Sequence, residues 1–217
     1  MVKAIVFDLD GTLTNTLTDL MNSVNHALRE CGMRERSYDE VRQFVGNGIH
    51  KLIERAVPEG TSEDRVEECF AVFKAYYIVH CQDTTTLYDG VHELLCKLKE
   101  MGYMTAIVSN KLQAGVDELY NRWFKDVVNV AIGERPGVPR KPAPDMVEIA
   151  LSSLGVEKHE AIYVGDSDVD IMTAQNSGLP CVSVLWGFRD RGFLIDKGAA
   201  ILISHPLELL DCQLLKQ

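Results

Sequence analysis

The stretch Ala4-Ile5-Val6-Phe7-Asp8-Leu9-Asp10-Gly11-Thr12 decides the architecture of this chain. Its apolar opening, residues 4–7, is typical of a short strand that is buried on both faces of a parallel sheet. The strand then gives way to two carboxylates, Asp8 and Asp10. Because open parallel sheets bind ligands beyond the carboxyl ends of their strands, the segment predicts both a sheet and a site at its edge.

Similar apolar runs recur later and predict the other strands, at 104–108, 127–132 and 161–164, with weaker candidates at 180–185 and 200–203. Helical patterns lie between them, such as the face shared by Val91, Leu94 and Leu98, which ends before Gly102. From about residue 86 onward helices and strands alternate. This order predicts an α/β fold with a doubly wound, Rossmann-like parallel sheet and helices on both faces.

The stretch from Thr16 to Asp83 breaks the alternation. It opens with an amphipathic stripe from Leu17 to Cys31, and Ser37 and Glu40 then have the spacing of a capping box. Two more helical patterns follow, and no convincing strand. We therefore expect an inserted α-helical domain over residues 16–83 and an α/β core made of residues 1–15 and 84–217.

The composition limits the classes of molecule that this protein is expected to bind. The formal net charge of -10 argues against nucleic acid and membrane surfaces, whose phosphates would be repelled. A small anionic substrate remains possible if a metal and a few cations reverse the field at one site. The six cysteines are dispersed without Cys-x-x-Cys spacing, which favours reduced thiols. With no leader and no apolar run near the roughly 18 residues that span a bilayer, a cytoplasmic location is expected.

Polar residues follow four of the predicted strands. They are Asp8 and Asp10 after the first; Ser109 and Asn110 after 104–108; Lys141 beyond a Gly/Pro-rich loop after 127–132; and Asp166, Asp168 and Asp170 after 161–164. The carboxyl ends of parallel strands meet at one edge of a sheet. The sequence therefore predicts that carboxylates, a hydroxyl and a lysine converge there.

This set of side chains suits phosphoryl transfer. Gathered carboxylates raise one another's pKa unless a cation lies among them, and hard oxygen ligands beside a phosphate favour Mg²⁺. One carboxylate can attack phosphorus to form an aspartyl-phosphate, and a second can act as general acid and base. Ser109 and Lys141 can bind the transferring phosphoryl oxygens.

Each element also has a purely structural interpretation. Asp-x-Asp-Gly is often a turn or a calcium loop, although this segment lacks the later acidic ligands and closing Glu of an EF-hand. Ser109-Asn110 could cap a helix, Lys141 could be a solvated lysine, and 166–170 could be an acidic helix start. Taken singly these interpretations are the commoner ones. All four together, each at a predicted strand end, make a shared structural origin improbable.

Four segments resemble the motifs of the haloacid dehalogenase-like hydrolase superfamily: Phe7-Asp8-Leu9-Asp10-Gly11-Thr12-Leu13, Val108-Ser109-Asn110, Lys141-Pro142 and Gly165-Asp166-Ser167-Asp168-Val169-Asp170. The helical insertion resembles the cap of the subgroup that contains phosphoglycolate phosphatase, β-phosphoglucomutase and phosphonatase. The chain departs from many relatives at Asn15-Thr16, where they carry Asp-Ser, a change that bears on the cap linker.

The resemblance implies a role for each matching residue. Asp8 would be the nucleophile and Asp10 the general acid/base, with Ser109 and Lys141 holding the phosphoryl group beside Thr12 and Asn110. Mg²⁺ would be bound by Asp8, the Asp10 carbonyl and Asp166, with Asp170 in support. In the cap, the segment Gly46-Asn47-Gly48 would contact the leaving group, although a plain turn before a helix is equally plausible.

The same residues narrow the activity. Dehalogenases and phosphonatases lack an acid at the position of Asp10, and Lys51, where a phosphonatase has its Schiff-base lysine, is better explained as a solvated helix residue. Gly46-Asn47-Gly48 and Trp186-Gly187-Phe188 resemble phosphoglycolate phosphatase relatives. We expect a Mg²⁺-dependent phosphatase, as monomer or dimer, that acts on a small phosphorylated metabolite, foremost phosphoglycolate. The alternatives are a β-phosphoglucomutase-like mutase, a pyrophosphatase, a sugar or nucleotide phosphatase, and a non-catalytic phosphate-binding regulatory protein.

Overall fold

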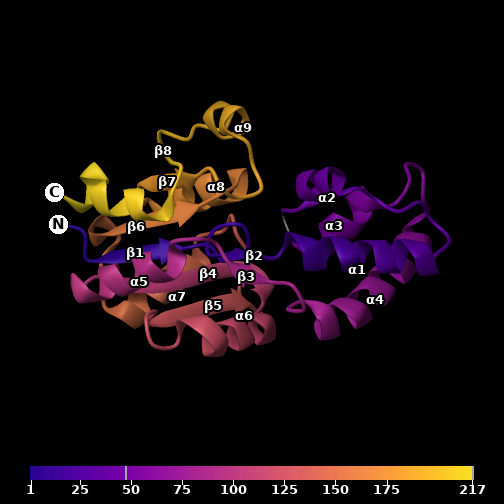
Figure 1. Cartoon of the computed structure of the whole chain (residues 1–217), viewed down its shortest axis with the longest axis horizontal. Coiled ribbons are helices and arrows are strands. Elements are labelled where there is room, and N and C mark those ends of the chain that lie inside the picture. The colour runs from indigo at the N-terminus through magenta and orange to yellow at the C-terminus, as the bar shows by residue number, and fades with distance from the viewer. Residues whose placement is uncertain (47, 217) are drawn as a thin grey trace. The chain divides into compact units, whose positions relative to one another are not determined.

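The chain divides into two compact units in a computed structural model that describes residues 1–46 and 48–216 (Figure 1). One unit comprises Met1–Thr14 and Leu87–Gln217, and the other Asn15–Thr86. The segment 16–83, expected to be an inserted helical domain, falls inside the second unit. None of the described helices is long and apolar enough to cross a bilayer.

The first unit is built on a six-stranded sheet with the order β5-β4-β1-β6-β7-β8. Its strands are β1 (Ala4–Phe7), β4 (Met104–Leu112), β5 (Val130–Glu134), β6 (Ala161–Gly165), β7 (Cys181–Val184) and β8 (Ile201–Ile203). All neighbours pair in parallel. β1 lies between β4 and β6, so successive strands are added outward on both sides of it. The predicted doubly wound sheet is confirmed, and β1 marks its switch point.

Helices cover both faces of this sheet (Figure 1). They are α5 (Val91–Glu100), α6 (Gln113–Leu119), α7 (Asp145–Leu154) and α8 (Asp168–Ser177), with short turns η1 (Tyr120–Phe124), η2 (Lys158–Glu160), η3 (Pro206–Asp211) and η4 (Gln213–Leu215). A further short helix, α9 (Arg191–Asp196), lies between β7 and β8 in the chain. Alternate residues of β1 enter opposite cores: Ile5 packs with Leu94 of α5, and Val6 with Met146 of α7. Burial on both faces explains why the strands appear in the sequence as unbroken apolar runs.

β5 starts three residues later than the expected strand at 127–132. The amides of Val127 and Val128 both bond to the carbonyl of Phe124, at 2.9 and 2.8 Å. They therefore form a turn that follows η1 and are not available to the sheet. The apolar run at 127–132 belongs partly to this turn and partly to a strand.

The second unit contains α1 (Leu17–Glu30), α2 (Tyr38–Phe44), α3 (Ile49–Ala56) and α4 (Glu63–His80). The predicted capping box is confirmed, since Ser37 Oγ accepts from Glu40 N at 3.3 Å and Glu40 Oε2 accepts from Ser37 N at 2.8 Å. Two short strands, β2 (Thr14–Asn15) and β3 (Thr86–Leu87), pair where the chain leaves and re-enters the first unit. Both lie outside the stretch 16–83, in which no strand was expected.

A buried carboxylate fixes the two ends of this insertion. Asp19, in the first turn of α1, accepts hydrogen bonds from the amides and hydroxyls of Thr84 and Thr85 at 2.6–3.1 Å. Its exposed fraction is 2%. Both carboxylate oxygens therefore have hydrogen-bond donors, as a buried polar group requires.

Candidate active site

The loop after β1 places Asp8 and Asp10 at the carboxyl edge of the sheet. Asp8 N donates to Val164 O at 2.9 Å, so the backbone stays in register with β6 before it turns. Gly11 has a φ of +93°, and a Cβ at this position would lie 2.5 Å from Asp166 Oδ2. The glycine is therefore needed for the turn and for the close approach of the loop to Asp166.

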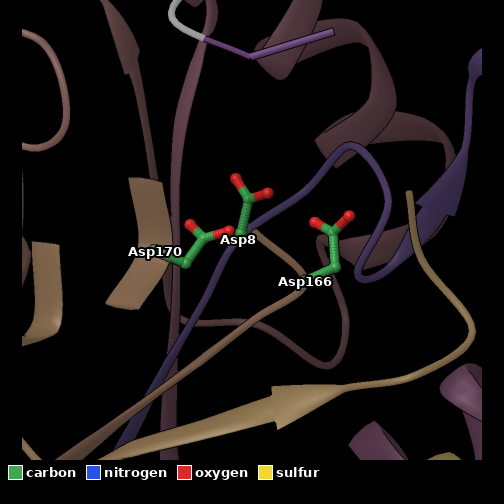
Figure 2. Close-up of side chains that lie close together, drawn as sticks. All are labelled: Asp8, Asp166 and Asp170. Carbon is green, nitrogen blue, oxygen red and sulfur yellow. The ribbon is translucent and has the colours of Figure 1, made fainter. Parts of the chain in front are cut away.

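Three carboxylates meet at this edge (Figure 2). Asp8 follows β1, Asp166 follows β6, and Asp170 lies in the first turn of α8. One oxygen from each lies within 4.8 Å of the other two, and all three residues are buried. Figure 2 shows the carboxylates projecting to the same side. The predicted convergence of Asp8, Asp166 and Asp170 is thus present in the structure.

Lys141 Nζ bridges two of these carboxylates. It donates to Asp8 Oδ1 at 2.6 Å, to Asp170 Oδ1 at 2.8 Å and to the Tyr163 hydroxyl at 3.1 Å. The Tyr163 hydroxyl donates in turn to Asp170 Oδ1 at 3.0 Å. The Lys141 side chain is 4% exposed, so the interpretation of Lys141 as a solvated surface lysine does not hold in this structure.

The backbone of Lys141 is held by Asn110. Lys141 N donates to Asn110 Oδ1 at 2.9 Å, and Asn110 Nδ2 donates to Lys141 O at 3.1 Å. Both ends of the Asn110 amide are therefore engaged with the loop that follows β5. In this arrangement Asn110 positions Lys141, and its direct contact with a phosphate stays a prediction.

Asp170 has two functions. Its Oδ2 accepts from Ser167 N at 3.1 Å and Ser167 Oγ at 2.6 Å, completing a capping box at the start of α8. Its Oδ1 faces Lys141 and Tyr163. The acidic helix start and the site residue are therefore the same group, and the two interpretations of 166–170 are compatible.

Burial controls the titration of the cluster. It raises the pKa of Asp8 well above its usual range, with repulsion from Asp170 adding to the effect and Lys141 opposing it. Burial and Asp170 also raise the pKa of Asp166 to about 7, against the amide of Phe188. Burial alone lowers the pKa of Lys141, but attraction to Asp170 and Asp8 outweighs it and the pKa stands well above its usual value.

The donor set fits a hard divalent cation. Three buried carboxylates face one buried ammonium, so the cluster carries excess negative charge when ionised. Burial is the largest cause of the raised pKa values of Asp8 and Asp166, and repulsion from Asp170 adds to it. A cation bound among oxygen ligands removes the repulsion, and Mg²⁺ prefers such ligands.

The end of β4 differs from the expectation. The sequence placed Ser109 and Asn110 beyond a strand that ends at Val108, but β4 continues to Leu112. The register with β5 shifts between Val108 and Leu112, where Leu112 pairs with Glu134. Such irregularities keep a strand paired while redirecting its side chains, so Ser109 and Asn110 lie within a bulged strand and not after it.

Two buried side chains were missed from the sequence. Lys111 is 7% exposed, and its Nζ lies 3.4 Å from Asp10 Oδ1. Tyr163 was counted among the apolar residues of its strand. For Tyr163 the available signal was a polar tip that needs a partner when the side chain is buried. For Lys111 the sequence offered no signal, because the predicted strand ended at Val108.

The segment 186–188 closes the site around Asp166. Phe188 N donates to Asp166 Oδ2 at 2.7 Å, and Trp186 Nε1 donates to Thr12 O at 2.9 Å. Thr12 Oγ1 donates to Asp166 Oδ1 at 3.3 Å. Thr12, expected near the phosphate, therefore orients Asp166 in this structure, and its contact with phosphate stays a prediction.

The residues expected to contact the leaving group lie in the other unit. Gly46 follows α2 by two residues and Gly48 immediately precedes α3, while Asn47 falls outside the described residues. Their proposed role therefore stays a prediction. Lys51 lies on α3, half exposed and paired with Glu54, which agrees with a solvated helix lysine.

Comparison with known proteins gives consistent matches. Residues 5–184, a range that contains Asp8 to Asp170, match the family described as haloacid dehalogenase-like hydrolase. A phosphoglycolate phosphatase from Mesorhizobium japonicum is 34% identical over 209 residues, covering 93% of this chain and 90% of the relative. Phosphoglycolate phosphatase 1 from Pseudomonas aeruginosa is 30% identical over 224 residues, which cover 97% of this chain and 79% of the relative.

Solved structures agree with these sequence matches. A candidate phosphoglycolate phosphatase from Lactobacillus delbrueckii subsp. bulgaricus superposes with a TM-score of 0.91 at 33% identity. The superposition covers 95% of this chain and 96% of that one. The similarity therefore extends through both compact units of the chain.

Proposed function

The chain belongs to the haloacid dehalogenase-like hydrolase family, and from that premise we propose that it is a Mg²⁺-dependent phosphatase whose leading substrate is phosphoglycolate. The family and its phosphoglycolate phosphatase relatives make the chain a phosphoric monoester hydrolase. The observation that carries the proposal is the buried cluster of Asp8, Asp166 and Asp170 bridged by Lys141.

Asp8 is the proposed nucleophile. Its carboxylate attacks the phosphorus of the bound ester, the P–O bond to the leaving alcohol breaks, and an aspartyl-phosphate forms on Asp8. Lys141, which contacts Asp8 at 2.6 Å, holds the carboxylate, and its positive charge would offset the charge of the phosphoryl oxygens. Ser109, buried at the irregular end of β4, would donate its hydroxyl to the same oxygens.

Asp10 is the proposed general acid and base. It donates a proton to the leaving oxygen in the first step and takes one from the attacking water in the second. That water displaces phosphate from Asp8 and restores the free carboxylate. The side chain of Asp10 is 20% exposed, in contrast to the buried Asp8, as suits a group that exchanges protons with solvent between the steps.

Asp8, the Asp10 carbonyl and Asp166, with Asp170 in support, would hold the Mg²⁺. The ion supplies positive charge that offsets both the carboxylates and the phosphoryl oxygens. Thr12 and the segment 186–188 keep Asp166 in place for this role. A locally positive site of this kind is required in a protein whose formal net charge is -10.

The helical unit is the proposed cap. Inserted caps exclude water and complete specificity when they close, and residues 46–48 are the proposed contact with the leaving group. The function of this unit is tested by substituting Gly46 and Gly48 with alanine. We expect a change in the ranking of substrates with little change in the rate on p-nitrophenyl phosphate.

Phosphate release decides the function. The purified protein should release phosphate from p-nitrophenyl phosphate and phosphoglycolate with Mg²⁺, and the rate should fall at least about 1000-fold in Asp8→Asn or in excess EDTA. Activity that survives either change would overturn the mechanism. Turnover that requires a bisphosphosugar and releases little phosphate would identify a mutase, and a panel of phosphorylated metabolites ranked by kcat/KM identifies the substrate.

A further inference from the structure

We propose that Lys111 binds a second anionic group on the leaving alcohol, so that the preferred substrates are phosphate esters of short hydroxy acids. The proposal rests on the phosphatase function and on Asp10 as the acid that faces the leaving oxygen. It assigns the recognition of the leaving group, within the core unit, to a residue that lies outside the catalytic set described above.

Lys111 is placed by the irregular end of β4. Between Val108 and Leu112 the register with β5 shifts, and Lys111 falls inside this interval. Its side chain is only 3% exposed, and Nζ lies 3.4 Å from Asp10 Oδ1. Among the described residues, Lys111 and Lys141 are the buried lysines, and both lie at the carboxyl edge of the sheet.

The aliphatic part of the Lys111 side chain lies against a glycine. Gly115, in α6, lies beneath it, and a Cβ at position 115 would be 3.2 Å from Lys111 Cε. A glycine inside a helix is less favourable than an alanine. The close approach of the Lys111 side chain gives a reason for glycine at this position.

The two buried lysines have different surroundings. Lys141 faces Asp8, the proposed site of phosphoryl attachment, and Asp170. Lys111 faces Asp10, the proposed acid, which must reach the oxygen that leaves. A carboxylate one carbon away from that oxygen, as in phosphoglycolate, falls within reach of an ammonium that lies beside Asp10.

A charge-assisted hydrogen bond to the substrate gives selectivity as well as affinity. An acidic protein repels anions, and it discriminates among phosphate esters only through local cations. Lys111 would favour an ester with a second negative charge over a neutral one of the same size. If Lys111 merely oriented Asp10, every ester would be affected equally, because each needs the same proton.

The test measures kcat/KM for 2-phosphoglycolate and for ethyl phosphate, which has a leaving group of similar size without the carboxylate. The wild-type protein should prefer phosphoglycolate, and Lys111→Met should lower the ratio of the two values roughly 10- to 100-fold. Lys111→Arg should keep part of the preference. Lys158→Met, an exposed lysine paired with Glu148 at the opposite edge of the sheet, should leave the ratio unchanged.

A second variant guards against misfolding. Gly115→Ala introduces a methyl group against Lys111 Cε while favouring the helix, so it should fold and still lower the same ratio. Equal loss on both esters in Lys111→Met would overturn the proposal and make Lys111 a positioning residue for Asp10. A wild-type ratio near one would overturn it too, although the phosphatase function would stand.

Measurements of substrate binding test the role of Lys111 independently of phosphatase activity. In the Asp8→Asn background, calorimetry with Mg²⁺ should show tighter binding of 2-phosphoglycolate than of ethyl phosphate, and Lys111→Met should remove the difference. If the wild-type protein hydrolyses neither ester, the proposed function fails, and the calorimetric difference still decides the role of Lys111. No difference in binding would overturn the proposal for Lys111.

Discussion

Both the main chain and the ammonium group of Lys141 are held by other residues of the site. Asn110 holds its main chain, while Asp8 and Asp170 hold its ammonium. The ammonium is the main compensation for two buried carboxylates. Removing it therefore affects both stability and chemistry, and the two effects can be measured apart.

Lys141→Met should lower the free energy of unfolding by about 3–5 kcal/mol at neutral pH, because it leaves buried carboxylates unpaired. It should also lower kcat/KM at least about 100-fold. Urea unfolding and steady-state kinetics measure the two effects. Lys158→Met, which breaks an exposed ion pair with Glu148, is the matched control and should change neither appreciably.

Tyr163→Phe tests a residue that acts through Lys141. Loss of a hydroxyl that bonds to Lys141 and Asp170 should lower kcat roughly 3- to 10-fold and leave the fold intact. Tyr103→Phe also loses one hydroxyl hydrogen bond, to Leu215 O at 3.0 Å, but precedes β4 at the other end of the sheet. An equal loss of kcat in both variants would contradict a positioning role for Tyr163.

At the scale of single residues, the sequence predicted those whose type is unusual for their place. Asp8, Asp10, Lys141 and Asp166 interrupt apolar or Gly/Pro-rich segments and could be identified without coordinates. Lys111 could not, because an exposed and a buried lysine are identical in sequence. Burial depends on the bulge of β4 and on α6, and both are tertiary features.

The bounds of strands were also predicted well where local sequence decides them and poorly where tertiary contacts do. Strands buried on both faces have a strong local signal, so β1 and β6 fall within a residue of their predicted bounds. The start of β5 and the end of β4 were displaced because hydrogen bonds to Phe124 and the shift opposite Glu134 decide them. Neither partner is visible in the apolar pattern.

Asp19→Ala should weaken the junction between the start of α1 and the segment before β3. It removes the acceptor for the amides and hydroxyls of Thr84 and Thr85, and we expect a loss of about 2–4 kcal/mol in the free energy of unfolding. Hydrogen exchange at the Thr84 and Thr85 amides should speed up. Asp39→Ala, an exposed carboxylate in the first turn of α2, should have a clearly smaller effect.

For the whole molecule, the doubly wound topology was the most predictable property. Asp8, Lys141 and Asp166, although distant in sequence, meet at one edge of the sheet, because β6 flanks β1 and the loop after β5 carries Lys141 to the same edge. Parallel strands send their carboxyl ends to one edge, so strand ends and residue types together predicted the cluster. The precise ligands and partners required the structure.

The stability of the whole protein without metal should depend on pH. Asp166 has a folded-state pKa of about 7, raised chiefly by burial, and an unfolded value near about 4. Between these values the folded state binds more protons, so the free energy of unfolding falls as pH rises and levels off above about 7. The pKa of Asp8 is also raised in the folded state, so this residue changes the free energy of unfolding with pH in the same direction.

Urea unfolding in EDTA should therefore give a value about 2–4 kcal/mol lower at pH 7.5 than at pH 5. Mg²⁺ should reduce this decline, because a bound cation stabilises the ionised carboxylates. Asp166→Asn should also flatten the curve. A decline of equal size in the wild type and in Asp166→Asn would show that other groups cause it.

Because β2 pairs with β3, the helical insertion begins and ends at two points that lie next to each other in space. Residues between them can be replaced without rethreading the sheet, since the order of the six core strands is unaffected by what the two short strands carry. We expect that grafting the corresponding segment of a relative between Asn15 and Thr86 would change the ranking of substrates by kcat/KM, while the core keeps Asp8 and Lys111.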